Sequence, residues 1–303
     1  MLSILIPEYN FNCCKLVADL ADQCLKEGIG YEILVMDDAS TKCSEENRNI
    51  AEMEGCQFIE LKENIRSAKI RNRLGQQAKY PYLLFLDCDL EIRDELFIHR
   101  YLEALGKAPV LVGAVVYQSH KPPVSQLLRW KYGNKRECMP LETRNSNPWK
   151  SLSSQNFLME KAVFEQVPFD ETIVSYGHED TLLGITLKDK GINVLYIDNP
   201  LIHNGLDSNE IFLAKSLVAV EQYAKLPVMR TPEVVGQVRI YAFYQQICFF
   251  KLDGLLAWKF RILRKGLQKN LCGPCPSLLL FDFYRLGHLC DVIRKRKRSD
   301  PAV

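Results

Sequence analysis

The sequence lacks the features that would place it across a membrane or in a secretory pathway. No run of about 18 apolar residues occurs, so we expect no membrane-spanning helix. The first residues carry neither a basic segment nor a long apolar stretch, and Pro7 interrupts them, which predicts a first strand instead of a signal peptide. Its 11 cysteines follow no dense spacing framework, a pattern typical of reduced thiols. We therefore expect a cytoplasmic protein.

What the chain does contain is ample core material and an uneven distribution of charge. With 303 residues, 47% hydrophobic and 25% charged, it is large enough for one α/β domain and an accessory region. From residue 239 to the end there are 13 Lys and Arg and 4 Asp and Glu, which gives this part a net charge of +9. The whole chain has a net charge of +2, so the first 238 residues have a net charge of −7. The sequence thus predicts an acidic body with a basic tail.

Strand and helix patterns alternate along the first two thirds of the chain. Apolar runs of strand length lie at 2–6, 32–36, 57–61, 82–86, 110–117, 155–159 and 193–197. Helical patterns lie between them at 12–26, 45–54, 65–78, 93–105 and 179–190. This alternation predicts an α/β fold with a mostly parallel sheet flanked by helices. Between residues 118 and 154 the periodicity fails, and we expect a long loop there.

Carboxylates directly follow two of the predicted strands. Asp37 and Asp38 follow the second strand, and Asp87 and Asp89 follow the run Tyr82–Leu86. Ligands of open α/β sheets bind at the carboxyl ends of the strands. Two carboxylates one residue apart are suited to a divalent cation that also binds substrate phosphate oxygens. The alternative is that Asp-x-Asp only begins a turn, since the pattern also occurs by chance.

Four motifs, in this order, resemble the nucleotide-sugar glycosyltransferases of family 2, which have the GT-A fold. They are Ile-Pro-Glu-Tyr-Asn at 6–10, Val-Met-Asp-Asp-Ala-Ser at 35–40, Asn64 with Ala-Lys-Ile-Arg-Asn at 68–72, and Tyr-Gly-His-Glu-Asp at 176–180. The resemblance covers about residues 1–205. It implies a GT-A catalytic domain over residues 1–207, followed by a helical, basic C-terminal region over residues 208–303.

The resemblance implies a pocket for the base of a nucleotide-sugar and favours uracil. Pro7 and Tyr9 would flank the flat ring, and Asp37 or Asp38 would accept a hydrogen bond from a base N–H. A tight turn capped by Asp is the alternative reading of the same residues.

The resemblance also implies a site for the diphosphate and for Mn²⁺ or Mg²⁺. Arg71, or Lys69, would supply positive charge to the diphosphate, although either residue would also suit a solvated helix face. Asp89 is expected to bind the metal directly, with Asp87 near the ribose or completing the metal shell. His203 would join the metal, and its alternative is a structural role.

An inverting transfer needs a carboxylate to remove the proton of the attacking hydroxyl, and we assign this base to Asp180. Glu179 would bind the acceptor or the donor sugar. Alternatively, both acids simply complement the N-terminus of a helix. The expected function is transfer of a sugar, from UDP, to a saccharide or lipid-linked acceptor in cell-surface polysaccharide or glycolipid synthesis. A sugar nucleotidyltransferase would need a glycine-rich loop after the first strand, and the sequence has none there.

Two further motifs carry less weight. Gln126 to Trp130 match the Gln-x-x-Arg-Trp motif of processive synthases, but they precede the acids at 179 and 180 instead of following them. Four residues of the tail are candidate zinc ligands with unusual spacing, namely Cys272, Cys275, His288 and Cys290.

The basic tail shows amphipathic helical spacing. Its apolar positions fall on one helical face, namely Leu252, Leu256, Phe260, Leu263 and Leu267. This face would pack on the catalytic domain or lie on an anionic membrane surface, and we favour peripheral contact with the inner face of the plasma membrane. We expect no nucleic-acid partner, since no recognition module is present. A catalytically inactive membrane-surface scaffold is the non-enzymatic alternative.

Overall fold

The computed structural model describes residues 1–150, 152–173 and 175–299, and it contains two compact units. The first unit comprises Met1–Gln118, Glu137–Val174 and Leu182–Gly205, and the second comprises Ser119–Arg136, Ser175–Thr181 and Leu206–Val303. By their contacts, residues 119–136, 175–181 and 206–207 of the predicted catalytic domain therefore belong to the helical unit. The domain boundary after residue 207 remains a prediction.

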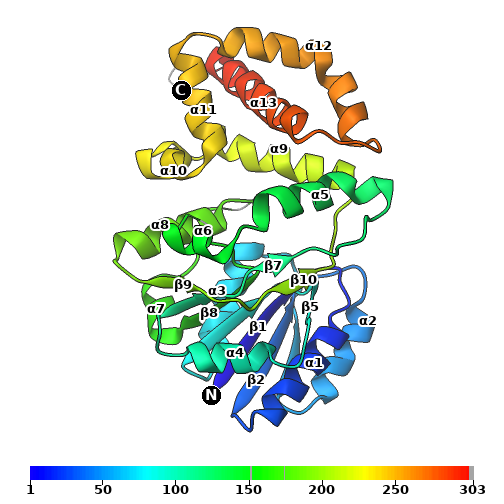
Figure 1. The fold of residues 1–303 in the computed structure, drawn as a ribbon, viewed down its shortest axis with the longest axis vertical. Coiled ribbons are helices and arrows are strands. Elements are labelled where there is room, and N and C mark those ends of the chain that lie inside the picture. The colour runs from blue at the N-terminus through cyan, green and yellow to red at the C-terminus, as the bar shows by residue number, and fades with distance from the viewer. Residues whose placement is uncertain (151, 174, 300–303) are drawn as a thin grey trace. The chain divides into compact units, whose positions relative to one another are not determined.

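A seven-stranded sheet forms the centre of the first unit (Figure 1). Its strand order is β3-β2-β1-β4-β8-β6-β9, and β8 is the strand that runs antiparallel to its two neighbours. The strands are β1 (Leu2–Glu8), β2 (Tyr31–Asp37), β3 (Cys56–Glu60), β4 (Tyr82–Leu86), β6 (Val110–Val112), β8 (Asn156–Glu160) and β9 (Val194–Tyr196). The predicted mostly parallel sheet is confirmed.

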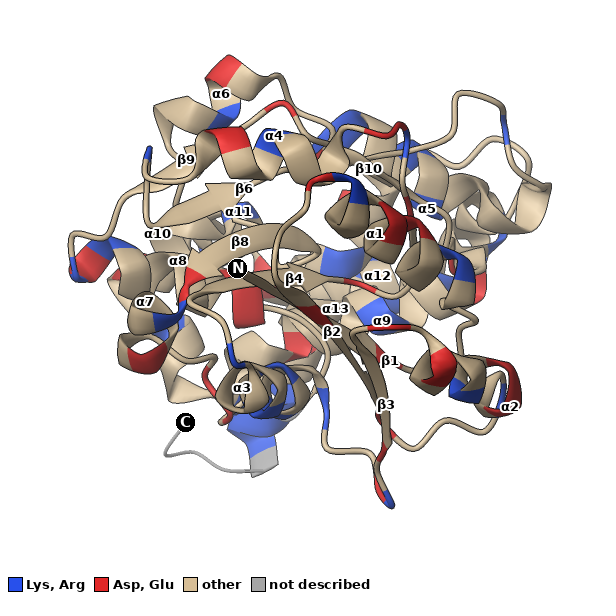
Figure 2. Ribbon diagram, turned by 90° about the horizontal axis from the view of Figure 1, so that it is seen from below, with Lys and Arg blue, Asp and Glu red and all other residues tan. Residues whose placement is uncertain are grey.

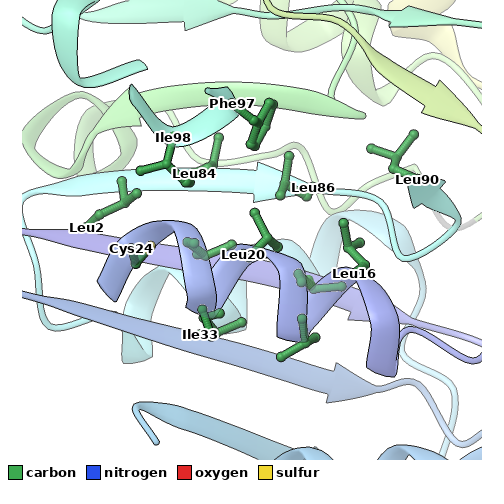
Figure 3. Packing of buried hydrophobic residues seen from close by; sticks show 14 of the residues in the cluster. Leu2, Leu16, Leu20, Cys24, Ile33, Leu84, Leu86, Leu90, Phe97 and Ile98 are labelled. Atoms are coloured by element: carbon green, nitrogen blue, oxygen red, sulfur yellow. The ribbon is translucent and has the colours of Figure 1, made fainter. Parts of the chain in front are cut away.

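Helices cover both faces of this sheet, because successive side chains of a strand point to opposite sides. On one face, α1 (Cys14–Lys26) and α4 (Phe97–Ala104) pack on residues such as Ile4, Ile33 and Leu84 (Figure 3). The opposite face carries α3 (Ser67–Gln77), α7 (Lys161–Gln166) and residues of α8 (Glu179–Asp189), packed on neighbouring positions such as Leu5, Leu34 and Phe85. The two cores fix the strands firmly, so the residues that follow them have defined positions.

A second, three-stranded sheet brings two distant parts of the first unit together. It contains β5 (Leu90–Glu91), β10 (Leu201–His203) and β7 (Val115–Val116), in the order β5-β10-β7. His203 of β10 pairs with Leu90 in the antiparallel register. The sequence analysis placed its last strand before Pro200 and so missed β10. With only three residues, β10 is too short to show a period.

The segment predicted to be a long loop contains several short helices, and this prediction was wrong. They are η2 (Val124–Gln126), α5 (Leu127–Tyr132), the π-helical turn η3 (Gly133–Glu137) and α6 (Leu141–Ser146). Side chains hold them in place, for example Asn209, whose Oδ1 accepts a hydrogen bond from the Leu128 N–H at 2.8 Å. The predicted helix at 45–54 is likewise divided, into α2 (Ser44–Asn47) and η1 (Arg48–Glu52).

The second unit is helical, as expected for the C-terminal region. Its main helices are α9 (Asn209–Lys225), η4 (Pro227–Arg230), α10 (Pro232–Gln237), α11 (Arg239–Phe249), α12 (Asp253–Leu271) and α13 (Leu278–Ser299). Helices α12 and α13 lie side by side (Figure 1), and Phe260, Phe281 and Tyr284 form part of their shared core. Among residues 1–150, 152–173 and 175–299, no helix has both the length and the apolar character needed to span a membrane.

Candidate functional site

Asp38, which follows β2, holds the loop that precedes α3. Its Oδ1 accepts the Ile65 N–H at 2.6 Å and its Oδ2 accepts the Arg66 N–H at 3.1 Å. Arg66 has a φ of 76°, a left-handed conformation that is strained for a side chain of this kind. Burial raises the pKa of Asp38, while the two N–H donors oppose this shift. The carboxylate therefore stabilises an unusual loop, and its contact with a base remains a prediction.

A small cavity of about 200 Å³ opens beside this loop. It is lined by Glu63, Asn64, Ile65, Arg66, Lys69, Glu171 and Ile173. Ligand pockets for drug-sized molecules are usually about 300–1,000 Å³. The cavity alone is thus too small for a complete nucleotide-sugar.

The turn after β1 is organised by Glu8, a residue that the sequence analysis did not single out. Glu8 is 1% exposed, and it accepts the Phe11 N–H at 2.8 Å and the Ser40 hydroxyl at 3.1 Å. Burial raises its pKa to about 7, and the nearby Asp37 charge adds to this shift. Glu8 pairs with Asp37 in the parallel register of β1 and β2, so it ties two strand ends together. The sequence did offer one indication of its role, because Glu8 stands at the end of an apolar strand.

Pro7 and Tyr9 flank Glu8 and differ in exposure. Pro7 is half-buried within β1, whereas Tyr9 is 53% exposed just beyond the strand. Asp37 Oδ1 accepts the Ser40 N–H at 2.7 Å, so its position is also fixed by the local turn. These residues lie at the carboxyl ends of β1 and β2, where the sheet is expected to bind ligands.

Arg71 and Asp87 form an ion pair between α3 and the end of β4. Arg71 Nη2 lies 2.5 Å from Asp87 Oδ1, and the Arg71 side chain is only 8% exposed. Burial raises the pKa of Asp87, and the Arg71 charge acts in the opposite direction. Lys69 and Arg73 lie instead on the exposed side of α3, whose basic residues are blue in Figure 2. Of the two residues predicted to bind the diphosphate, Arg71 is therefore buried in an ion pair and Lys69 is exposed.

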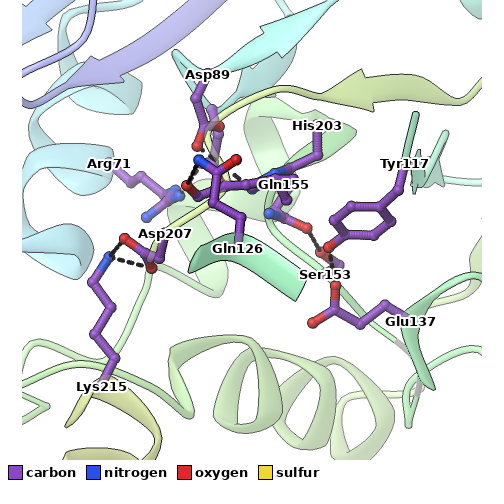
Figure 4. A network of polar contacts seen from close by, with 12 residues as sticks. Arg71, Asp89, Tyr117, Gln126, Glu137, Ser153, Gln155, His203, Asp207 and Lys215 are labelled. Carbon is purple, nitrogen blue, oxygen red and sulfur yellow. Dashed lines mark hydrogen bonds and ion pairs between the residues drawn. The ribbon is translucent and has the colours of Figure 1, made fainter. Parts of the chain in front are cut away.

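Asp89 and His203 meet where β5 pairs with β10. Asp89 Oδ2 lies 3.4 Å from His203 Nε2, and Figure 4 shows the two side chains pointing toward each other. The Tyr117 ring lies against His203 with a centroid separation of 5.4 Å, and the Tyr117 hydroxyl donates a hydrogen bond to Glu137. The sequence analysis did not anticipate Tyr117, because only the β7–β10 pairing brings it near.

Gly205 leaves room for the Asp89 carboxylate. A Cβ atom at Gly205 would lie 1.9 Å from Asp89 Oδ2, closer than any real contact allows. The Asn204 N–H also donates to the Asp89 carbonyl oxygen at 2.9 Å. The two residues after β10, Asn204 and Gly205, thus both contact or make room for Asp89.

The residues at this position fit a divalent cation of the expected kind. Mg²⁺ is usually bound by one or two carboxylates together with substrate phosphates and water, and imidazole is a good ligand for many transition metals. Asp89 and His203 would hold the ion, and Asp87 lies two residues from Asp89. Over the described parts of the chain, no group of three or more His, Cys, Asp or Glu side chains is assembled around one point. Substrate oxygens would therefore have to complete the ligand set.

Glu179 and Asp180 form the first turn of α8, directly after two residues with positive φ. Gly177 has a φ of 101° and His178 a φ of 78°. His178 Nε2 lies 2.7 Å from the Tyr241 hydroxyl and 3.1 Å from a carbonyl oxygen of α9, and burial lowers the pKa of His178. All these residues belong to the second unit, which holds the start of α8 through His178. The roles of Glu179 and Asp180 remain predictions.

The remaining motifs have structural explanations. The Gln126 side chain donates to the Leu206 carbonyl oxygen at 2.9 Å. His288 Nε2 lies 2.8 Å from Glu221, and Cys290 is fully buried, with burial raising the pKa of its thiol to about 12. The four candidate zinc ligands are all described, and they form no metal-binding group.

Comparison with known proteins identifies relatives at the level of family and fold. The model of the family described as glycosyl transferase family 2 matches residues 3–167. Among curated proteins, no sequence matches this chain.

Two of the solved structures that match this chain have low sequence identity to it, and the fold assignment rests on the first of them. The mannosyltransferase PcManGT from Pyrobaculum calidifontis, in complex with GDP-Man and Mn²⁺, has a TM-score of 0.57 and 12% identity, covering 97% of this chain and 87% of that chain. TarS 1-349 of S. aureus, in complex with UDP, has a TM-score of 0.48 and 16% identity, covering 99% of this chain and 92% of that chain. The fold of this chain is therefore that of the GT-A glycosyltransferases, as predicted.

Proposed function

We propose that this chain, which belongs to glycosyl transferase family 2, transfers a sugar from a nucleotide-sugar to an acceptor with inversion at the anomeric carbon. The observation that carries the proposal is the approach of Asp89 to His203, 3.4 Å apart, beside the buried Arg71–Asp87 pair. Carboxylate and imidazole groups are suitable ligands for a divalent cation, and a guanidinium group is suited to a diphosphate. The complex of PcManGT with GDP-Man and Mn²⁺ supports a donor and a metal of this kind.

In this proposal, Asp89 and His203 hold Mn²⁺ or Mg²⁺, which when bound would neutralise negative charge on the leaving diphosphate. Asp87 orients Arg71, whose charge faces the same end of β4. Pro7, Tyr9 and one of Asp37 or Asp38 would hold the base, which we propose to be uracil. The support for uracil is the motif set at the ends of β1 and β2.

We assign the proton-accepting role to Asp180, and contact with a sugar to its neighbour Glu179. Adjacent positions on a helix point about 100° apart, so the two carboxylates do not share one direction. Support comes from the left-handed residues Gly177 and His178, since strained backbone often occurs at functional sites. The acceptor we propose is a saccharide or a lipid-linked saccharide of cell-surface polysaccharide or glycolipid synthesis, reached from the cytoplasmic side.

The first experiment measures slow donor hydrolysis with a panel of UDP- and GDP-sugars, because it needs no knowledge of the acceptor. We expect one nucleotide class to be hydrolysed with Mn²⁺ or Mg²⁺, and hydrolysis to stop with a chelator. Calorimetry should show UDP binding with Mn²⁺, and Asp89→Ala should abolish this binding. Asp94→Ala is the matched control, since Asp94 lies on the surface and pairs with Arg100. Absence of nucleotide binding in the wild type would instead favour an inactive scaffold.

The base assignment has its own test once an acceptor is found. Asp180→Asn should lower kcat by about 10²–10⁴-fold while nucleotide binding and the melting temperature stay unchanged. NMR of the first product formed should show the anomeric configuration opposite to that of the donor. If Asp180→Asn transfers sugar at the wild-type rate, another residue is the base.

A further inference from the structure

Helix α12 carries apolar residues on two sides, whose centres are about 130° apart around the helix axis. On the side predicted from the sequence, Phe260 and Leu267 are buried in the core that α12 shares with α13, whereas Leu252 and Leu263 are each 49% exposed. On the other side, Leu255 is 49% exposed, Trp258 56% and Ile262 60%. Residues three and four positions apart lie on one side of a helix, so these three form a single stripe.

Two further exposed aromatic residues stand at the end of α11, just before α12. Phe249 is 81% exposed and Phe250 67% exposed, and their rings contact each other with centroids 5.2 Å apart. Lys251, with a φ of 56°, separates them from α12, which begins at Asp253. Single exposed apolar residues are common on proteins, but these two and the three of the stripe are five large exposed apolar side chains within 14 residues of the chain, which makes them a candidate interaction site.

The charges around the stripe are all of one sign. No Asp or Glu occurs between residues 254 and 281. Lys259 and Lys265 are exposed and occupy positions on either side of the stripe, at helical angles of about 40° from Leu255 and about 20° from Trp258, respectively. Asp253 at the start of α12 accepts a hydrogen bond from Arg294 at 2.8 Å, which places the basic end of α13 beside the first turn of α12.

We propose that this outer α12 surface, formed by Phe249, Phe250, Leu255, Trp258 and Ile262 with flanking lysines, binds the surface of an anionic lipid bilayer. A helix with an apolar stripe, an interfacial Trp and Lys on its flanks can lie in the plane of the headgroups, with the lysine chains reaching the phosphates. A second copy of this chain is a poorer partner, because a symmetric contact through this surface would bring lysines against lysines. The proposal does not depend on the reaction assigned above.

Co-sedimentation of the full chain with vesicles tests this proposal. We expect binding to phosphatidylcholine vesicles containing about 30% phosphatidylglycerol and much weaker binding to pure phosphatidylcholine. Trp258→Ser with Ile262→Ser should lower the partition coefficient at least about tenfold, because two large apolar side chains no longer enter the interface. Lys259→Gln and Lys265→Gln should each lower it about fivefold, and added salt should weaken binding.

Matched controls distinguish binding through this surface from non-specific binding to vesicles. Leu25→Ser changes an apolar residue of α1 that is 54% exposed, and Lys188→Gln with Lys190→Gln removes two exposed lysines of the first unit. Neither control should alter vesicle binding. Equal binding of the Trp258/Ile262 variant and the wild type would overturn the proposal. So would a dimer in light scattering that Trp258→Ser dissociates, together with no binding to vesicles.

Discussion

Two strands on either side of β1 end in carboxylates, yet different partners hold the two pairs of acids. Asp38, after β2, accepts hydrogen bonds from two backbone N–H groups of the loop before α3. Asp87, after β4, contacts the Arg71 guanidinium, and Asp89 faces the His203 imidazole. In the sequence the two pairs look alike, since the first follows the apolar run 33–36 and the second the apolar run 82–86.

The difference shows that distant partners, and not the local motif, decide what such acids do. Backbone N–H groups are neutral donors with fixed positions, so they make Asp38 part of the loop's architecture. Arg71 carries a positive charge that can bind an anionic substrate, and the His203 imidazole can bind a metal. The end of β4 is therefore suited to an ionic substrate and a metal. We therefore expect substitutions at Asp89 to affect chemistry and those at Asp38 to affect stability.

The largest effect is expected for Asp89→Asn. Donor hydrolysis or sugar transfer with Mn²⁺ should fall by about 10³-fold, because a neutral amide is a much poorer metal ligand and charge on the diphosphate is no longer balanced. Steady-state kinetics measure the effect on activity, and thermal melting of the same preparation measures the effect on stability. A large loss of melting temperature without a loss of activity would show that Asp89 resembles Asp38 after all.

Arg71→Leu should give the next largest effect, on stability. Removing one partner of a buried ion pair leaves the other charge uncompensated, and we expect about 3 kcal/mol of destabilisation in urea unfolding. The double variant with Asp87→Asn should recover much of this loss, since no buried charge then remains. Arg73→Leu, on the exposed side of the same helix, is the control and should change stability by less than about 0.5 kcal/mol. If Arg71→Leu and Arg73→Leu lower the free energy of unfolding equally, the ion pair contributes nothing to stability.

Much of the fold followed from the sequence because long elements carry a strong period. The apolar runs at β1, β2 and β4 and the acids after them were all placed correctly. Short elements were missed, namely β10 and the helices between Val124 and Ser146, because three to six residues hold too little pattern. Tertiary contacts such as that of Asn209 with the start of α5 fix them instead.

The candidate site was only partly readable for a related reason. Asp89 and His203 were proposed together on the resemblance, and β5–β10 pairing does place them side by side. The burial of Glu8 and the contact of the Tyr117 ring with His203 depend on strand neighbours that no local motif encodes. On α12, the period correctly indicated an apolar face, but it did not reveal that Phe260 and Leu267 of this face are buried while Leu252 and Leu263 stay exposed. Nor did it reveal the second exposed stripe.

Asp38→Ala should lower stability by about 2 kcal/mol, because the two N–H groups of Ile65 and Arg66 lose a charged acceptor. Hydrogen exchange of those two amides should become faster than that of the rest of α3. Asp22→Ala, at an exposed position of α1, serves as the control. If exchange in the loop is unchanged, Asp38 is not what holds this loop, and its role would have to lie in ligand binding.

The smallest effect is expected for Glu8, which joins the ends of β1 and β2. Its pKa is about 7 in the folded chain against an ordinary value of 4.5, so the folded state binds a proton more tightly than the unfolded state. The contribution of this group is therefore most favourable below pH 4.5 and is lost as the pH rises toward 7. Glu8→Gln keeps an oxygen acceptor for the Phe11 N–H but cannot ionise. The melting temperature of the variant, measured against that of the wild type from pH 5 to 8, should gain on the order of a degree or two toward the alkaline end. A difference that stays constant across this range would show that Glu8 does not titrate there.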